Sequence, residues 1–245
     1  MFIDMQQPVT SKIAGGILYE PSLFGKPEPQ LFEPAYWLSR DTAASIQGGR
    51  GQVLFIHDGD RRWVLRHYRR GGLIARFNKD RYLWRGAETT RSFREWRLLT
   101  KLIGMQLPVP VPVAARYVRG LVSYRADLIT MEIPGARSLS SLLMNSPMEN
   151  ARWQQLGRTL ARFHKLGVHH ADLNAHNIVL DQMDAIYVLD FDRGTIRSPE
   201  RAWIDAVLAR LLRSLNKLKA QRDIHFNDEN WQQLRAAHDS FMTAG

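Results

Sequence analysis

The chain has 245 residues, no cysteine and a formal net charge of +10. The missing cysteines exclude disulfides and thiolate metal sites, and 44% hydrophobic with 10% aromatic residues excludes an extended disordered chain. No apolar run approaches the roughly 20 residues of a membrane-spanning helix, so we expect a globular protein with one large domain or two small lobes.

Residues 1–30 are punctuated by proline and glycine, which predicts extended edge structure or a loose arm. Two β-rich runs follow at 53–56 and 63–65, and the turn signal His57-Asp58-Gly59-Asp60 between them predicts a hairpin. Just before the first run, Gly48-Gly49-Arg50-Gly51 offers backbone N–H groups to a phosphate, because glycine adopts the required dihedral angles at little cost. An ordinary β-turn explains the same four residues equally well.

Positive charge is concentrated between residues 66 and 97. This segment holds ten basic and three acidic residues, a net charge of +7, interleaved with aromatic residues. Such a segment is typical of proteins that bind a polyanion, whether nucleic acid, an anionic membrane or a phosphorylated substrate. A solvated basic face is the alternative, and we favour binding because the charge is so concentrated.

The same region ends in a predicted helix, since apolar residues recur at helical spacing over about 91–104. The proline-rich stretch 108–112 leads into further strands, which end at 128–131. Pro134-Gly135 then reads as a hinge.

Helices dominate the rest of the chain. Apolar residues from Trp153 to Phe163 predict a buried helix that ends near Gly167, and a last helical region covers about 200–219. Two short β segments are predicted near 178–180 and 186–189. This order predicts an N-terminal lobe with a β-sheet and one helix, a hinge, and a helical C-terminal lobe, with the boundaries 1–130, 131–137 and 138–245.

Three polar residues between the predicted helices suit phosphoryl transfer. Asp172 is followed five residues later by Asn177, and Asp190 stands after the last short apolar run. One carboxylate can address a hydroxyl group, while an amide and a second carboxylate hold Mg²⁺. Each residue alone would be a turn or capping residue, but together at these offsets they indicate a kinase.

These motifs make the chain resemble the lipopolysaccharide kinase family of the protein-kinase superfold. The resemblance covers roughly residues 20–215. Its carriers are Gly48-Gly49-Arg50-Gly51, Val64-Leu65-Arg66-His67-Tyr68-Arg69-Arg70-Gly71-Gly72, Phe93-Arg94-Glu95-Trp96, Met131-Glu132-Ile133-Pro134-Gly135-Ala136, His170-Ala171-Asp172-Leu173-Asn174-Ala175-His176-Asn177 and Asp190-Phe191-Asp192-Arg193-Gly194.

The resemblance implies an α+β, two-lobed protein-kinase-like fold with an ATP cleft between a small β-rich lobe and a mainly helical one. It makes Asp172 the catalytic residue and assigns Mg²⁺ to Asn177 and Asp190. His170 becomes a structural residue that bonds the loop backbone; a zinc cluster with its neighbouring histidines is the alternative. The residues expected at ATP are Gly48, Gly49, Gly51, Arg66, Glu95, Met131, Glu132 and Ile133.

Arg66 departs from the usual pattern, because kinases commonly place a lysine at this strand end. Arginine keeps the charge and can grip phosphate with two N–H groups, and Glu95 is its expected partner. The alternative is that Arg66 belongs only to the basic segment.

By resemblance, the acceptor is the 4-hydroxyl of the sugar acid Kdo on the lipid A precursor, in lipopolysaccharide core biosynthesis. No Ala-Pro-Glu segment follows Asp190, which also favours a small or lipid-linked acceptor over a peptide. The basic segment would meet the acceptor and the anionic inner membrane from its cytoplasmic face as a peripheral protein, with Phe77, Tyr82 and Trp84 dipping into the interface. The residues expected at the substrate are Arg69, Arg70, Arg76, Lys79 and Arg81.

Three other functions fit parts of the sequence. A kinase of another saccharide, such as a lipopolysaccharide heptose or an aminoglycoside-like molecule, would keep every ATP residue. A kinase-like protein without activity is compatible with arginine at position 66. A nucleic-acid-binding protein would explain only the charge, and we expect no nucleic-acid partner.

Overall fold

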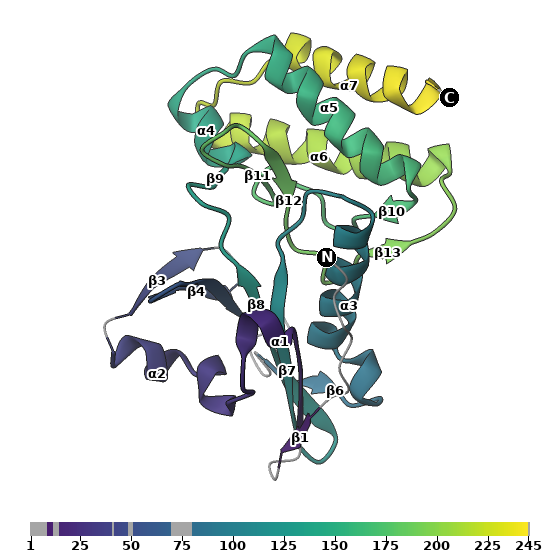
Figure 1. Cartoon of the computed structure of the whole chain (residues 1–245). Helices are drawn as coiled ribbons and strands as arrows, with labels where there is room; N and C mark the ends of the chain where they lie inside the picture. Colours follow the sequence, from purple (N-terminus) through teal and green to yellow (C-terminus); the bar gives the residue numbers. More distant parts are fainter. Residues whose placement is uncertain (1–8, 12–14, 41, 49–50, 70–79, 245) are drawn as a thin grey trace. The chain divides into compact units, whose positions relative to one another are not determined.

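The computed structural model divides the chain into two units, which Figure 1 colours along the sequence. It describes residues 9–11, 15–40, 42–48, 51–69 and 80–244. The N-terminal unit consists of Met1–Gly104 and Pro110–Glu132, and the C-terminal unit of Met105–Val109 and Ile133–Gly245.

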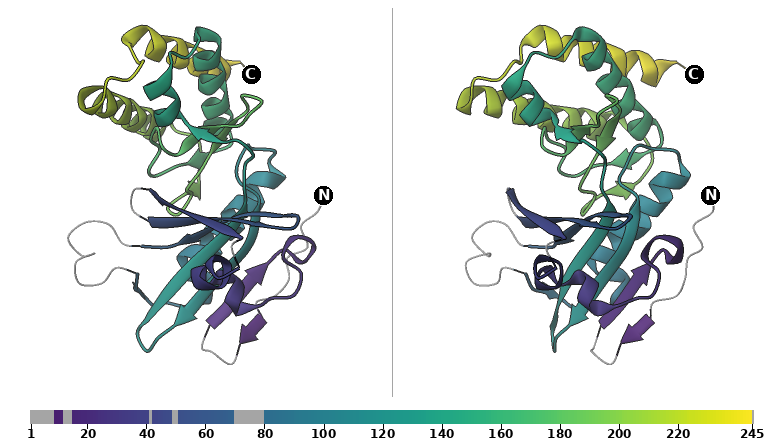
Figure 2. Two further views of the ribbon diagram at one scale, coloured as in Figure 1. Left: turned by 90° about the vertical axis from the view of Figure 1, so that its left-hand side faces the viewer. Right: turned by 60° about the vertical axis from the view of Figure 1, so that its left-hand side comes forward.

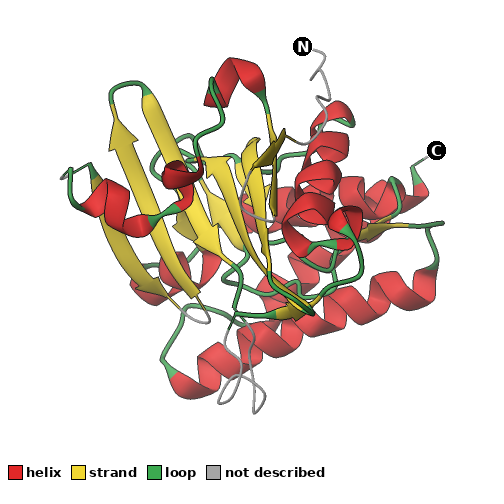
Figure 3. Cartoon of the chain, turned by 90° about the horizontal axis from the view of Figure 1, so that it is seen from below, coloured by secondary structure: helices red, strands yellow, loops and turns green. Residues whose placement is uncertain are grey.

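The N-terminal unit is built on one antiparallel sheet, whose strands are yellow in Figure 3. The strand order is β1-β2-β7-β8-β5-β4-β3, with β6 paired to β8. The strands are β1 (Val9–Ser11), β2 (Gly15–Tyr19), β3 (Ala43–Gly48), β4 (Gly51–Asp58), β5 (Arg61–His67), β6 (Tyr82–Leu83), β7 (Pro112–Arg119) and β8 (Ser123–Met131). The predicted hairpin at 57–60 is confirmed as the connection between β4 and β5.

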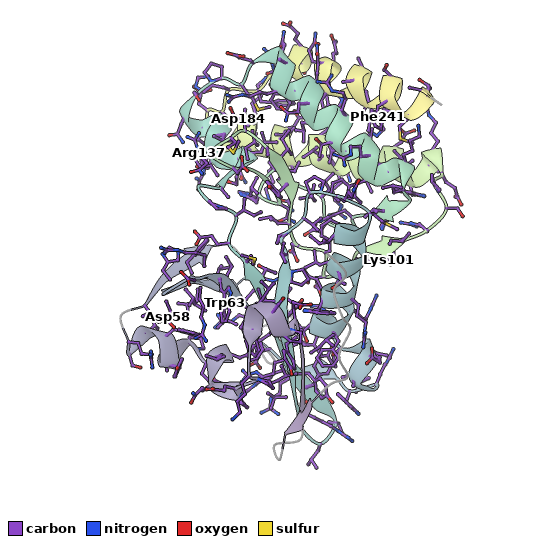
Figure 4. The ribbon with its side chains drawn as sticks, viewed as in Figure 1. Asp58, Trp63, Lys101, Arg137, Asp184 and Phe241 are labelled. Carbon is purple, nitrogen blue, oxygen red and sulfur yellow. The ribbon has the colours of Figure 1, made fainter. Side chains whose placement is uncertain are left out.

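Side chains of β5 alternate between the two faces of the sheet. Trp63 and Leu65 belong to a core cluster with Phe24 and Trp37. The Trp63 ring, labelled in Figure 4, stacks on Phe24 with centroids 5.7 Å apart and meets Trp37 edge-on. Arg66 points to the opposite face. A single strand therefore contributes both to the core and to the candidate site.

Of the two alternatives predicted for residues 1–30, extended edge structure is confirmed at β1 and β2, which lie at one edge of the sheet, and a loose arm is wrong for the described part. Here β2 pairs with β7, and three short helices follow, namely α1 (Pro21–Phe24), η1 (Pro29–Phe32) and α2 (Pro34–Leu38). Each of these helices begins with a proline, which suits a first helical position because its backbone N–H would be unpaired there. The prolines thus start helices that bury aromatic side chains.

The helix predicted over 91–104 is present as α3 (Arg91–Gly104). It packs on β7 and β8. The Phe93 ring meets Tyr117 of β7 at 5.2 Å, and the Ser92 hydroxyl donates to the carbonyl of Arg116 at 2.8 Å. These contacts fix the helix face that carries Glu95.

The C-terminal unit is mainly helical. Its helices are α4 (Leu139–Asn145), α5 (Asn150–Lys165), α6 (Arg201–Gln221) and α7 (Asp228–Thr243). Its strands are β9 (Arg137–Ser138), β10 (Val168–His169), β11 (Ile178–Leu180), β12 (Ile186–Val188) and β13 (Thr195–Ile196), paired in the order β12-β11-β9 and as β10-β13. Within the described ranges, no helix has the length and apolarity to cross a membrane.

Helix α7, which the sequence patterns did not predict, packs along α5 (Figure 2). The two backbones come closest at Gly157, where an added Cβ would lie 2.1 Å from the carbonyl oxygen of Leu234. Only glycine allows this approach, because a methyl group would overlap a backbone atom that cannot rotate away.

We expect Gly157→Ala to destabilise the C-terminal unit by about 1–3 kcal/mol, since α7 must shift to admit the methyl group. In an unhindered helix the same change would stabilise by roughly 1 kcal/mol, so the sign of the effect is diagnostic. Urea unfolding measures the difference, and Gly104→Ala is the control because a Cβ there meets nothing within 4 Å. A more stable Gly157→Ala protein would contradict the close helix contact.

A buried histidine pair also joins α5 to α7. Nδ1 of His164 lies 2.9 Å from Nε2 of His238, and Nδ1 of His238 lies 3.0 Å from the Asp239 carboxylate. The carboxylate only accepts, so His238 donates to it from Nδ1 and accepts from His164 at Nε2. Burial, reinforced by His238, lowers the pKa of His164 to about 3.

Acid should therefore weaken this pair. The unfolded chain takes up a proton at His164 near pH 6.5 but the folded chain only near its pKa of about 3, so stability falls as the pH falls through that window. Between pH 7 and pH 5 we expect a loss of about 2 kcal/mol from this group.

Hydrogen exchange of α5 and α7 peptides at both pH values, corrected for intrinsic rates, measures the loss. His164→Asn should remove much of the pH dependence, whereas the exposed His225→Asn should not. An unchanged pH dependence in His164→Asn would refute the assignment.

Candidate active site

Residues 170–177 form the loop between β10 and β11, and His170 holds it in place. The buried imidazole accepts from the backbone N–H of Asp172 at Nδ1, at 3.2 Å, and donates from Nε2 to the carbonyl of Leu189 at 2.8 Å. Burial lowers the pKa of His170, which keeps the ring neutral as these two bonds require. The prediction that His170 bonds the loop backbone is confirmed.

The Asp172 carboxylate is half-exposed and has one charged partner. Nη1 of Arg210, on α6, donates to Oδ1 of Asp172 at 2.8 Å. One turn further along α6, the Ser214 hydroxyl accepts from the backbone N–H of Ala175 at 3.2 Å. This face of α6 is therefore fixed against the loop that carries Asp172.

Asn177 closes the same loop. Its side-chain amide donates from Nδ2 to the carbonyl of Asp172 at 3.1 Å. A carbonyl can pair only with the nitrogen, so this bond fixes the amide orientation and directs Oδ1 elsewhere. The Asn177 carbonyl also accepts from the N–H of Leu189 at 2.8 Å, which ties the loop to the residue before Asp190.

Asp190 has a φ of +63°, in the left-handed region that non-glycine residues rarely adopt. Such strain is typical of functional positions that the surrounding structure holds in place. Here the neighbours on either side are fixed, because Leu189 bonds Asn177 and His170, and the carbonyl of Phe191 accepts from Gly194 at 2.8 Å.

The donor set fits magnesium. Asn177 and Asp190 provide neutral and charged hard oxygen atoms, and Mg²⁺ commonly takes one or two carboxylates while keeping several waters and binding substrate phosphates. Across the described part of the chain, no three His, Cys, Asp or Glu side chains gather as a metal cage. A Mg²⁺ ion that substrate phosphates also bind does not need such a cage of protein ligands.

In the N-terminal unit, Arg66 and Glu95 form an ion pair between Nη2 and Oε2. Glu95 is only 2% exposed, and the Tyr68 hydroxyl also donates to Oε2 at 2.5 Å. The Arg66 guanidinium lies over the Tyr68 ring, 4.8 Å from its centroid. A buried carboxylate is tolerated because a cation and a hydroxyl both satisfy it.

The remaining residues expected at the nucleotide lie at strand ends. Gly48 ends β3 and pairs with Gly51, which begins β4, while Gly49 lies outside the described residues. At the expected hinge, the N–H of Met131 donates to Val111 and that of Glu132 donates to Arg62, both at 2.8 Å. Adenine recognition would therefore use other backbone groups of residues 131–133.

The Glu132 side chain is also engaged. Its Oε2 lies 2.6 Å from Nε2 of His57 on β4, so this carboxylate braces the sheet. Of the residues expected at the substrate, Arg69 and Arg81 are exposed. The other three, Arg70, Arg76 and Lys79, lie outside the described residues.

Two site contacts escaped sequence reasoning. Arg210 lies in the helical region predicted over about 200–219, but nothing local connects it to Asp172, 38 residues away. Tyr68 stands in the same motif as Arg66, but the sequence analysis predicts no role for it. Its spacing of two residues from Arg66 was the available signal, because residues two apart in an extended chain point to the same side.

Comparison with known proteins identifies a family and several relatives that match most of the chain. The lipopolysaccharide kinase (Kdo/WaaP) family matches residues 35–238. A 3-deoxy-D-manno-octulosonic acid kinase of Xylella fastidiosa (strain 9a5c) is 44% identical over 94% of this chain and 92% of its own length. The corresponding kinase of Stenotrophomonas maltophilia (strain R551-3) gives the same three values, and that of Xanthomonas campestris pv. campestris (strain B100) is 41% identical over 92% and 90%.

Among solved structures, the bifunctional kinase-methyltransferase WbdD is similar at 17% identity and a TM-score of 0.46, over 78% of this chain and 42% of that chain. The fold seen here is a mixed α+β kinase-like fold, with an antiparallel sheet in the N-terminal unit and a helical C-terminal unit. The resemblance drawn from the sequence motifs is confirmed. With a family match from residue 35 to residue 238, the chain belongs to the lipopolysaccharide kinase (Kdo/WaaP) family.

Proposed function

We propose that this protein transfers the γ-phosphoryl group of ATP to the 4-hydroxyl of Kdo on the lipid A precursor. The observation that carries the proposal is the loop 170–177, in which His170 and Asn177 fix Asp172 and the residue before Asp190. Family membership and 41–44% identity to Kdo kinases over nearly the whole chain support the sugar acceptor.

Asp172 has the role of orienting the attacking hydroxyl and accepting its proton. Phosphoryl transfer passes through a loose transition state, so position matters more than strong basicity. The Asp172 backbone is held at its N–H by His170 and at its carbonyl by Asn177, which limits how far the carboxylate can move. The half-exposed side chain remains accessible to an acceptor.

Asn177 and Asp190 are the proposed ligands of Mg²⁺. They would hold the ion at the reacting phosphates, where its charge would offset the negative charge that develops during transfer. Arg66 has the proposed role of holding nucleotide phosphates from the N-terminal unit. Its Nη2 is bonded to Glu95 and Tyr68, so one edge of the guanidinium is fixed and the planar group is preorganised for bidentate binding.

The acceptor is an acid, which suits the charge of this chain. The +7 segment over residues 66–97 would attract a phosphorylated lipid headgroup, and Arg69 and Arg81 are exposed members of it. A lipid-linked acceptor places the reaction at the cytoplasmic face of the inner membrane, with the protein bound peripherally.

The test is phosphate transfer from radiolabelled ATP with Mg²⁺ to the Kdo-bearing lipid A precursor, beside free Kdo and the lipid without Kdo. We expect label only on the Kdo-lipid. Asp172→Ala should lower the rate roughly 10²–10⁴-fold, the range for loss of a positioned proton acceptor. Asp223→Ala, an exposed loop acid, is the matched control.

Label on none of the three acceptors, from a folded protein that still binds ATP, would refute the Kdo acceptor and turn the search to other saccharides. Equal rates for Asp172→Ala and Asp223→Ala would refute the role of Asp172. ³¹P NMR of the product identifies the hydroxyl that carries the phosphate.

Arg210 is a proposed positioning residue, because it pairs with Asp172 without being a metal or nucleotide ligand. We expect Arg210→Ala to lower kcat roughly ten- to a hundredfold by loosening the carboxylate, while KM for ATP stays unchanged. Arg210→Lys should recover part of the loss, since it keeps the charge. Arg213→Ala, an exposed arginine one turn further along α6, is the control. A change in KM for ATP alone would contradict this role.

A further inference from the structure

The turn between β7 and β8 carries apolar residues where polar ones are usual. The N–H of Gly120 donates to the carbonyl of Ser123 at 2.6 Å, which closes a tight turn around Leu121 and Val122. Turn centres are normally occupied by Gly, Asn, Asp, Ser or Pro. Here the two central side chains are 96% and 72% exposed. Figure 2 shows this hairpin ending near the lower edge of the N-terminal unit.

A third exposed apolar side chain lies beside the turn. Leu83 of β6 pairs with Ser123 and is 58% exposed. In the part of the chain that the structure describes, seven large apolar side chains are exposed, and these three gather at one turn. A cluster of this kind marks a surface that binds something apolar, whereas single exposed residues need no explanation. We call Leu83, Leu121 and Val122 the apolar tip.

Arginines surround the base of the apolar tip. A shallow recess of about 100 Å³ is lined by Arg81, Arg119 and Arg125, together with the turn residues Gly120 and Ser123. The Arg81 guanidinium reaches the turn, since Nη1 lies 3.7 Å from the Cβ position of Gly120. Arg125 contacts the Asp80 carboxylate at 2.8 Å, and the described residues that line the recess include these three arginines and no acidic residue. The recess therefore has a net positive charge.

The backbone beneath the apolar tip is fixed. The N–H of Trp84 donates to the carbonyl of Val122 at 3.0 Å. The Trp84 ring packs on Tyr117 at 5.1 Å, and Arg119 lies over the same ring, 4.8 Å from its centroid. The turn thus presents its apolar side chains without first having to order its backbone, which lowers the entropic cost of binding.

The structure assigns this turn as a membrane-docking element: we propose that the apolar tip inserts among the lipids of an anionic bilayer while Arg81, Arg119 and Arg125 bind lipid phosphates. The combination of inserted apolar groups with a surrounding cationic ring is the arrangement that peripheral proteins use at bilayer interfaces. This docking element rests on the proposed function in one respect. A lipid-linked acceptor lies in a membrane, and it gives the protein a reason to bind there.

This assignment changes which residues meet the bilayer. Of the three aromatic residues expected to dip into the interface, Tyr82 is buried and its hydroxyl accepts from Arg91 at 2.9 Å. Trp84 is half-buried against Tyr117. Phe77 lies outside the described residues. The expectation is therefore wrong for Tyr82, whose side chain packs inward, and the exposed aliphatic residues of the apolar tip take its place.

Binding to vesicles without acceptor tests the docking directly. We expect the protein to co-sediment with vesicles of phosphatidylglycerol and phosphatidylcholine but not with phosphatidylcholine alone. Leu121→Asp with Val122→Asp should weaken binding roughly tenfold or more. Arg119→Gln and Arg125→Gln should each weaken it roughly fivefold, with a smaller dependence on salt. The control is Met183→Asp, which places the same charge at an 82% exposed site in the C-terminal unit.

A fluorescent label locates the inserted residue. The chain has no cysteine, so Leu121→Cys creates a single site for an environment-sensitive dye. We expect a blue shift when anionic vesicles are added, and none for Met183→Cys. Vesicle binding with no shift at position 121 would overturn the proposal, as would vesicle binding that Leu121→Asp with Val122→Asp leaves unchanged. Failure of the wild-type protein to bind anionic vesicles, with inorganic phosphate still protecting the arginines from modification, would reduce the recess to a free-anion site.

The proposed docking and the proposed catalysis can be tested independently. Leu121→Asp with Val122→Asp should leave the rate unchanged on acceptor dispersed in detergent and lower it on acceptor embedded in vesicles. Kinase activity without vesicle binding would refute the docking element and leave the proposed function standing. Vesicle binding through position 121 without any phosphate transfer would refute the proposed function and leave the docking element standing. Unchanged thermal melting of the variant, expected because both side chains are solvent-exposed, establishes that it is folded.

Discussion

The imidazole of His170 is the constraint on which the geometry of the proposed catalytic groups depends. Its two ring nitrogens bond the backbone on either side of the site, at Asp172 and at Leu189. Asn177 adds two further hydrogen bonds, one to the carbonyl of Asp172 and one from the N–H of Leu189. Residues far apart in the chain are thereby held in one geometry. Asp190 can keep its left-handed backbone only because its neighbours are fixed in this way. A neutral, buried histidine serves this purpose well, since a charged ring could not accept from the N–H of Asp172.

A buried carboxylate imposes the corresponding constraint in the N-terminal unit. Glu95 is almost fully buried, and removing a carboxylate from water is costly unless charge and hydrogen bonds compensate. Arg66 of β5 and Tyr68, which follows the strand, provide both. Arginine is well suited to the place usually held by lysine, because a planar guanidinium can bond Glu95 along one edge and stack on Tyr68. Glu95 and Tyr68 thus both contact the arginine that stands in place of the usual lysine at position 66.

The positive charge of this chain is less available than its sum indicates. Within the basic segment, Arg97 is paired with Glu88, and Arg91 donates to Tyr82 while lying over its ring. Whether a basic side chain can bind another molecule therefore depends on where the fold places it. Arg119 and Arg125 are far from Arg81 in the sequence, but the pairing of β6 with β8 brings all three to one recess. Electrostatic attraction to an anionic surface depends on such local groupings more than on net charge.

The sequence predicts the family, helix α3 and the order of the proposed catalytic groups, because these depend on local spacing and on residue chemistry within short motifs. It did not determine α7, whose packing requires Gly157 to meet a backbone carbonyl 77 residues away. Nor did it connect Arg210 to Asp172 or pair Leu83 with Ser123, since such contacts arise when helices and strands distant in the chain pack together. The helices that begin at Pro21 and Pro29 were not predicted for a related reason. They are too short to leave a periodic signal, and tertiary burial of aromatic side chains stabilises them.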